Sequence, residues 1–106
     1  MQRTITHPVT FQGIGLHSGQ PAQLTIRPAP AGAGIVFRRV DVTGTSNEIP
    51  AIWHLVEQSP LCTRLVNVEG VAITTVEHVM AALVGCGIHN ALVDVDGPEV
   101  PILDGS

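Results

Sequence analysis

The chain has 106 residues, which is the length of one ordinary domain, and its 44% hydrophobic and 13% charged content favours a folded core over disorder. The net charge is −4 and the five basic residues form no extended basic run, which argues against a nucleic-acid-binding protein. No run of 18 apolar residues predicts a transmembrane helix. The N-terminal residues lack the pattern of a signal peptide, so a cytoplasmic location is expected.

The first half of the chain is predicted to form β-strands separated by turns. Alternation of apolar and polar residues predicts strands over 2–12 and 22–27, the second of them half-buried. Residues 35–40 are predicted to form a third strand, and the polar stretch 41–50 a turn. Residues 51–58 fit either a short helix or a strand.

The second half of the chain begins with a predicted hairpin. Residues 61–68 and 71–73 are its two strands, with Glu69 and Gly70 in the turn between them. Residues 91–95 are predicted to form a buried strand, and residues 101–106 a polar turn.

Between these segments, the sequence predicts one helix over about residues 75–84. Apolar side chains recur there at helical spacing, at Val76, Val79, Met80, Leu83 and Val84. Thr74 and Glu77 have the spacing of an N-terminal capping box, and Gly85 and Gly87 mark the end of the helix. The order of elements predicts a single α+β domain: a two-layer sandwich in which this helix covers one face of a mixed β-sheet.

The residues best suited to chemistry are Glu77 and His78, which are adjacent in the first turn of this helix. Imidazole nitrogen is a common zinc ligand, and a carboxylate beside a metal can take a proton from water. Catalytic zinc sites use about three protein ligands, so His78 alone does not make a site. The alternative is structural: Glu77 as a helix cap and His78 as an ordinary helix residue.

The remaining histidines and the cysteines add little to such a site. His7, His54 and His89 form no metal-binding spacing with His78, whereas His17 lies between glycines in a loop that could reach a site. No C-x-x-C motif is present, which excludes a thiolate zinc finger. Two free thiols are therefore expected at Cys62 and Cys86.

Five motifs in register give the chain a resemblance to a known enzyme family. The motifs are GIGLHSG (13–19), RPAP (27–30), SPLCTRLVN (59–67), TTVEHVMAAL (74–83) and EVPILDGS (99–106). Together they resemble the UDP-3-O-acyl-N-acetylglucosamine deacetylases of lipid A biosynthesis in Gram-negative bacteria. The resemblance covers the whole chain but less than half of the usual length of the family.

The resemblance implies roles for particular residues. His78 would be a zinc ligand and Glu77 the general base that activates water for hydrolysis of the 2-acetamido group. Leu61, Cys62 and Thr63 would border the substrate and its acyl chain, and His17 would lie near the site. The segment Asp104–Ser106 would lead into a second domain.

The resemblance also implies that residues 1–106 are the first of two similar domains whose helices pack together around the active site. The other two zinc ligands and a general-acid histidine would belong to the C-terminal domain, which the chain lacks. We therefore expect it to be inactive alone towards a UDP-sugar lipid. A free-standing metal-binding module, formed by two copies across the exposed helix face, and an inactive structural remnant are the alternatives.

Overall fold

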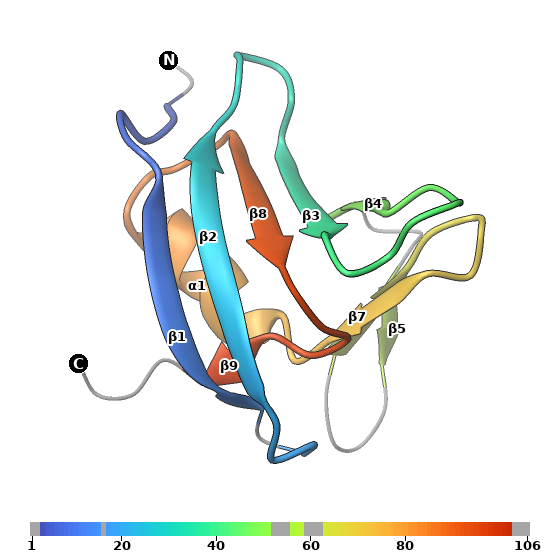
Figure 1. Ribbon diagram of the computed structural model, residues 1–106. Helices are drawn as coiled ribbons and strands as arrows, with labels where there is room; N and C mark the ends of the chain where they lie inside the picture. Colours follow the sequence, from blue (N-terminus) through green and yellow to red (C-terminus); the bar gives the residue numbers. More distant parts are fainter. Residues whose placement is uncertain (1–2, 16, 52–55, 59–62, 103–106) are drawn as a thin grey trace.

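The computed structural model describes residues 3–15, 17–51, 56–58 and 63–102 (Figure 1). In this part of the chain the elements are β1 (Val9–Gly15), β2 (Pro21–Pro28), β3 (Ile35–Arg39), β4 (Glu48–Pro50), β5 (Val56–Gln58), β6 (Thr63–Val66), β7 (Ala72–Thr74), α1 (Glu77–Gly85), β8 (Ala91–Val95) and β9 (Pro101–Ile102). No helix among these residues is long and apolar enough to cross a membrane.

The strands form two sheets. The larger has six strands in the order β4-β3-β8-β2-β1-β9, and its pairings are antiparallel except for the parallel pair β3 and β8. The smaller is an antiparallel sheet in the order β5-β6-β7. The helix α1 lies behind β1, β2 and β8 in Figure 1 and covers that face of the larger sheet. The predicted α+β class with a mixed sheet and one covering helix is confirmed.

The core lies where both sheets and the helix meet. Leu24, Phe37 and Val93 of the larger sheet are fully buried. The cluster continues through the smaller sheet and the helix, with Leu65, Ile73, Val76, Val79 and Leu83. Among the described residues, Phe37 is the one aromatic side chain of this cluster, and the others are aliphatic. The helix contributes its buried stripe at positions three and four residues apart, which is the expected period.

The ends of α1 differ in how well the sequence predicts them. At the C-terminus, Gly87 has a φ of 72°, its N–H donates to the carbonyl of Val84, and the Ile88 N–H donates to that of Leu83. This is a Schellman motif, in which the left-handed position favours glycine. The predicted glycine stop is thus confirmed at Gly87, while Gly85 is the last helical residue.

At the N-terminus, the predicted capping box is wrong. The N-cap residue is Val76, and no side chain makes a capping hydrogen bond. Thr74 is still in the extended β7 strand, where its main-chain N–H donates to Pro98 and its carbonyl accepts from Val100. Since these tertiary hydrogen bonds hold Thr74 in the strand, the helix begins after the position that the capping pattern predicted.

Other element boundaries shift by a few residues. The first strand begins at Val9 instead of residue 2, and the hairpin strands are β6 and β7 with the predicted turn between them. The ambiguous segment 51–58 ends in strand β5, and its residues 52–55 lie outside the described part. Two short strands were not predicted: β4, within the expected turn 41–50, and β9, within 101–106. Both are too short for a periodic pattern, and pairing with β3 and β1 defines them.

The segment from Pro98 to Ile102 joins the two sheets. Thr74 of the smaller sheet forms a parallel bridge with Glu99. Three residues later, Ile102 pairs with Ile14 of the larger sheet, and Pro101 pairs with Gly15. Glu99 therefore lies at the junction of the sheets, close to the residues that lead into α1.

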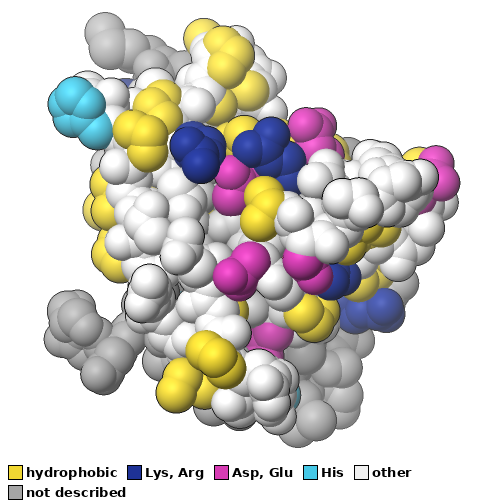
Figure 2. Space-filling view, viewed as in Figure 1, with side chains coloured by type: hydrophobic (Ala, Val, Ile, Leu, Met, Phe, Trp, Pro, Cys, Tyr) yellow, Lys and Arg dark blue, Asp and Glu magenta, His cyan; other side chains and the backbone are white. Residues whose placement is uncertain are grey.

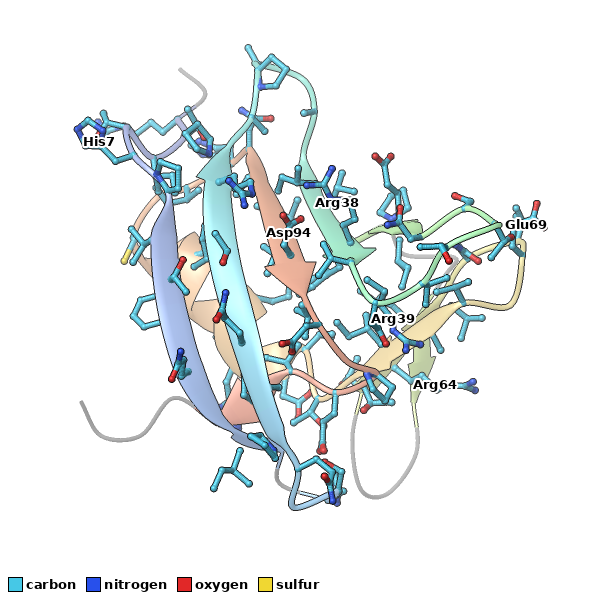
Figure 3. All side chains as sticks on the ribbon, in the orientation of Figure 1. His7, Arg38, Arg39, Arg64, Glu69 and Asp94 are labelled. Atoms are coloured by element: carbon cyan, nitrogen blue, oxygen red, sulfur yellow. The ribbon has the colours of Figure 1, made fainter. Side chains whose placement is uncertain are left out.

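The face of the larger sheet opposite the helix is polar. Figure 2 shows Arg and acidic side chains gathered over the middle of this face. Asp94 of β8 lies between Arg27 of β2 and Arg38 of β3, and Arg38 faces it directly in Figure 3. The closest N···O distance is 2.8 Å in both pairs. These ion pairs connect three adjacent strands across the sheet.

Candidate functional site

Glu77 and His78 occupy the first turn of α1, next to the junction of the two sheets. The Glu77 side chain is half-buried and that of His78 is exposed. The described residues place no hydrogen-bond partner on the His78 imidazole. The imidazole is therefore accessible to a ligand or to another part of a protein.

Thr63, at the start of β6, connects the smaller sheet to this helix turn. Its carbonyl oxygen accepts a hydrogen bond from the Thr75 N–H at 2.8 Å. Its own N–H donates to Glu77 Oε2 at 3.3 Å. One peptide segment thus contacts both the residue before the helix and the first helical carboxylate. The structure thus places Thr63 next to Glu77, while the predicted contact of Thr63 with a substrate stays a prediction.

Thr75 has an unusual backbone conformation. Its φ is 64°, and it is the non-glycine residue with a positive φ in the described part of the chain. A β-branched residue in this region is strained by an amount of order 1–3 kcal/mol. The residue is buried, and its hydroxyl donates to Glu99 Oε2 at 3.1 Å. The strained position lies two residues before Glu77, where the chain turns from β7 into α1.

Glu99 also binds the loop that follows β1. Its Oε2 accepts a hydrogen bond from the His17 N–H at 2.9 Å, and its Oε1 accepts one from the Ser18 N–H at 3.0 Å. The Glu99 residue is only 5% exposed. A single buried carboxylate therefore connects the loop containing His17 to the strained residue before the helix.

The hydrogen bonds to Glu99 stabilise its charged form. Burial by itself raises the pKa of this carboxyl group. The two loop N–H groups, together with the hydroxyls of Ser18 and Thr75, have the larger combined effect and lower its pKa below the ordinary value. Glu99 is thus held as a carboxylate near neutral pH.

Gly15 makes room for this carboxylate. A Cβ atom at position 15 would overlap Glu99 Oε1 and the Ser18 hydroxyl. The Gly15 carbonyl also accepts a hydrogen bond from the Gly19 N–H at 2.9 Å, which closes the loop. Glycine is required at position 15 because the Glu99 carboxylate approaches its backbone closely, and not because of a positive φ.

An apolar groove runs beside His78, between α1 and the edge of the larger sheet. It has a volume of about 620 Å³ and is lined by residues such as Phe11, Ile26, Val79, Ala82 and Leu83. Phe11 is 37% exposed, and Val84, farther along the helix, is 69% exposed. A contiguous apolar lining such as that of the groove is typical of a surface that binds another protein segment or an apolar ligand.

The described residues fit one ligand of a metal site and not a complete site. They contain no group of three or more His, Cys, Asp or Glu side chains that could hold a metal ion. His78 offers a neutral donor type that zinc accepts, with the adjacent Glu77 carboxylate. Further ligands would have to come from outside this part of the chain.

Some of the other predicted residues lie in the described part of the chain and some lie outside it. The His17 side chain is exposed, and its position near the helix start depends on the main-chain bond to Glu99. Leu61, Cys62 and His54 lie outside the described residues, as does Asp104–Ser106. Cys86 is an exposed free thiol, as expected.

The other two histidines lie in the described part of the chain. His89 Nδ1 accepts a hydrogen bond from the Arg3 N–H at 2.9 Å, which fixes the N-terminal segment. His7 is exposed, near the N-terminal end of the chain (Figure 3).

Sequence reasoning missed Glu99 and Thr75 as members of this site. A signal was available for Glu99, because it is an acidic residue next to the apolar run Val100-Pro101-Ile102. A buried charge in such surroundings requires partners. No pattern in the sequence indicates the positive φ of Thr75, since that conformation is uncommon for threonine.

Comparisons with known proteins show the family to which the chain belongs. The family model described as UDP-3-O-acyl N-acetylglycosamine deacetylase matches residues 2–106. The chain belongs to this family.

Curated relatives named UDP-3-O-acyl-N-acetylglucosamine deacetylase include proteins of Vibrio atlanticus, Idiomarina loihiensis and Shewanella halifaxensis, at 54%, 50% and 50% identity. Each match extends over 105 residues and covers 99% of this chain. The chain spans about a third of the length of these relatives, 34% in each case.

Proposed function

We propose that residues 1–106 are the N-terminal domain of a zinc-dependent deacetylase that hydrolyses the 2-acetamido group of UDP-3-O-acyl-N-acetylglucosamine in lipid A biosynthesis. The observation that supports this most directly is family membership along the chain, together with an accessible His78 beside a carboxylate held by Thr63. A cytoplasmic location stays a prediction.

In this proposal Glu77 is the general base. The Thr63 N–H donates to Oε2 of the carboxylate and holds it in place, and the carboxylate accepts a proton from the attacking water. The water oxygen then bonds to the acetamido carbonyl carbon, and cleavage of the C–N bond releases acetate and leaves an amine on the sugar. Protonation of the leaving nitrogen is assigned to a histidine of the C-terminal domain, as the family resemblance implies.

His78 is proposed to provide one zinc ligand through a neutral ring nitrogen, with the remaining ligands in the C-terminal domain. Zinc, when bound, supplies a Lewis acid that polarises a carbonyl and acidifies a nearby water molecule. The exposure of His78 supports a shared site, because a ligand that completes its shell with a second domain must face outward.

The apolar groove also supports an active site shared between two domains. Its lining forms an apolar surface beside His78 that a second domain could cover. Packing there would bring that domain's groups towards Glu77 and His78. Thr63 and the His17 loop, with Leu61 and Cys62, are proposed to contact the substrate.

The test joins this chain, after residue 106, to the remainder of the Vibrio atlanticus relative, which is 54% identical over the shared part. We expect the joined protein to release acetate from UDP-3-O-acyl-N-acetylglucosamine and the 106-residue chain to release none. The His78→Ala form of the joined protein should lose zinc and activity together. A folded, zinc-loaded joined protein without acetate release would contradict the proposal.

A further inference from the structure

The Glu99 carboxylate is the point at which two separate segments of the site meet. It accepts hydrogen bonds from the N–H groups of His17 and Ser18 on the loop after β1, and from the hydroxyl of Thr75 before α1. In the described part of the chain, no hydrogen bond joins Thr75 directly to His17 or Ser18. Beside the backbone pairings of Gly15 and Thr74 with the segment that contains Glu99, this side chain is the hydrogen-bonding link between the loop and the helix start.

The backbone of Glu99 is held by main-chain hydrogen bonds that do not involve its carboxylate. The main chain on either side of Glu99 pairs with Thr74, through the N–H of Thr74 to Pro98 and the N–H of Val100 to Thr74. The strand that follows pairs with β1 at Gly15. The carboxylate thus projects from an anchored segment, and its donors on the loop and before the helix are oriented towards it.

The strained conformation of Thr75 has a physical explanation in this arrangement. A φ of 64° is unfavourable for a β-branched residue and persists only where surrounding interactions compensate. Its N–H binds Thr63 and its hydroxyl binds Glu99, so both polar groups are used. This conformation sets the direction in which the chain enters α1, and hence where Glu77 and His78 lie.

We propose that Glu99 is a positioning residue that aligns the His17 loop with the Glu77–His78 turn, through charge-assisted hydrogen bonds to His17, Ser18 and Thr75. The structural part of this inference stands without any assumption about activity. Its catalytic consequence rests on the proposed function. Glu99 itself is buried and is not assigned contact with the substrate.

The first test uses NMR of the 106-residue chain to detect the link from Thr75 through Glu99 to the amides of His17 and Ser18. Thr75→Val removes the hydroxyl and keeps the side-chain shape, whereas Thr75→Ser keeps the hydroxyl. We expect Thr75→Val to shift the amide signals of His17 and Ser18 and Thr75→Ser to leave them nearly unchanged. In a Glu99→Ala background, which offers no side-chain acceptor to these donors, Thr75→Val should no longer affect these amides. Equal shifts in the two Thr75 variants, or the same shifts without Glu99, would overturn the proposal.

Gly15→Ala gives an approach that leaves Thr75 and Glu99 unchanged. Its Cβ would overlap Glu99 Oε1, so the carboxylate must move. We expect the amide signals of Thr75, His17 and Ser18 to shift together. If Thr75→Val does not fold, this variant decides the question, and unchanged signals at Thr75 would refute the connection.

The second test measures catalysis in the joined protein described above. Glu99→Gln should lower kcat by about 10²-fold with little change in KM, because a small misplacement of catalytic groups reduces the chemical step. Glu69→Gln, the same change on an exposed turn, should have no effect. Equal kcat in the two variants would contradict the positioning role. An inactive unsubstituted protein would instead contradict the proposed function and leave the NMR result standing.

Discussion

Arg38 on β3 binds Asp94 on β8 through two parallel hydrogen bonds, from Nε to Oδ1 and from Nη2 to Oδ2, each 2.8 Å long. Arg27 on β2 adds a third, so Asp94 is held from both neighbouring strands. Burial raises the pKa of Asp94, but the hydrogen bonds and charges of the two arginines outweigh it and lower the pKa below its ordinary value of 3.8. The aspartate is therefore ionised whenever the sheet is folded near neutral pH.

This arrangement predicts a loss of stability in acid. Because the folded pKa of Asp94 is lower than the unfolded one, its contribution is complete above about pH 4 and is lost as the pH falls through the folded pKa. The lowered pKa of Glu99 acts in the same direction. Urea denaturation from pH 7 to pH 2 should show a falling free energy of unfolding below about pH 4.

The Asp94→Asn form isolates the contribution of Asp94 to the pH dependence of the free energy of unfolding. At pH 7 it should be less stable by about 1.5–3 kcal/mol, the usual range for hydrogen bonds to a charged group. The loss should lie near the lower end of this range because both arginines are partly exposed to solvent. The difference should shrink in acid, where the unsubstituted protein also loses its carboxylate. Glu69→Gln is the control, and a difference that stays constant with pH would refute this account.

Phe37 and Phe11 should respond differently to truncation. Phe37 is fully buried in the core, whereas Phe11 lines the apolar groove and is 37% exposed. Phe37→Ala should lower the free energy of unfolding by about 3–5 kcal/mol, because it leaves a cavity. Phe11→Ala should have a clearly smaller effect in the 106-residue chain. Equal losses in thermal denaturation would mean that the groove is closed in solution.

Glu77→Gln separates a catalytic role from a structural one. The amide oxygen of Gln can still accept the Thr63 N–H, and the carboxylate makes no capping hydrogen bond. The melting temperature of the 106-residue chain should therefore barely change. In the joined protein, acetate release should fall by about 10²–10⁴-fold, the usual loss for a general base. A large loss of stability with unchanged activity would assign Glu77 a structural role.

Zinc binding by the 106-residue chain should be weak. The described residues contain no cluster of three ligands, and His78 contributes one. Calorimetric titration of the chain and its His78→Ala form should give similar, weak heats, whereas the joined protein should bind tightly. Tight binding that depends on His78 in the chain alone would favour a metal site between two copies, which light scattering with zinc would detect as a dimer.

The sequence by itself determined the elements whose pattern is local. The alternation in β2, the buried strand β8, the turn at Glu69 and Gly70 and the helix stop at Gly87 all appear as predicted, because side-chain periodicity and glycine conformation act over a few residues. The five motifs also identified the family, and the adjacency of Glu77 and His78 is a fact of the chain.

Only the tertiary structure decided how the site is held together. The hydrogen bonds of Glu99 reach residues 82 and 81 positions away in the chain, at His17 and Ser18, and 24 positions away at Thr75. The same long-range pairing kept Thr74 in a strand and defined β9, against the local capping pattern. Local sequence cannot encode such partners, because whether a buried carboxylate is stable depends on which donors the fold brings to it.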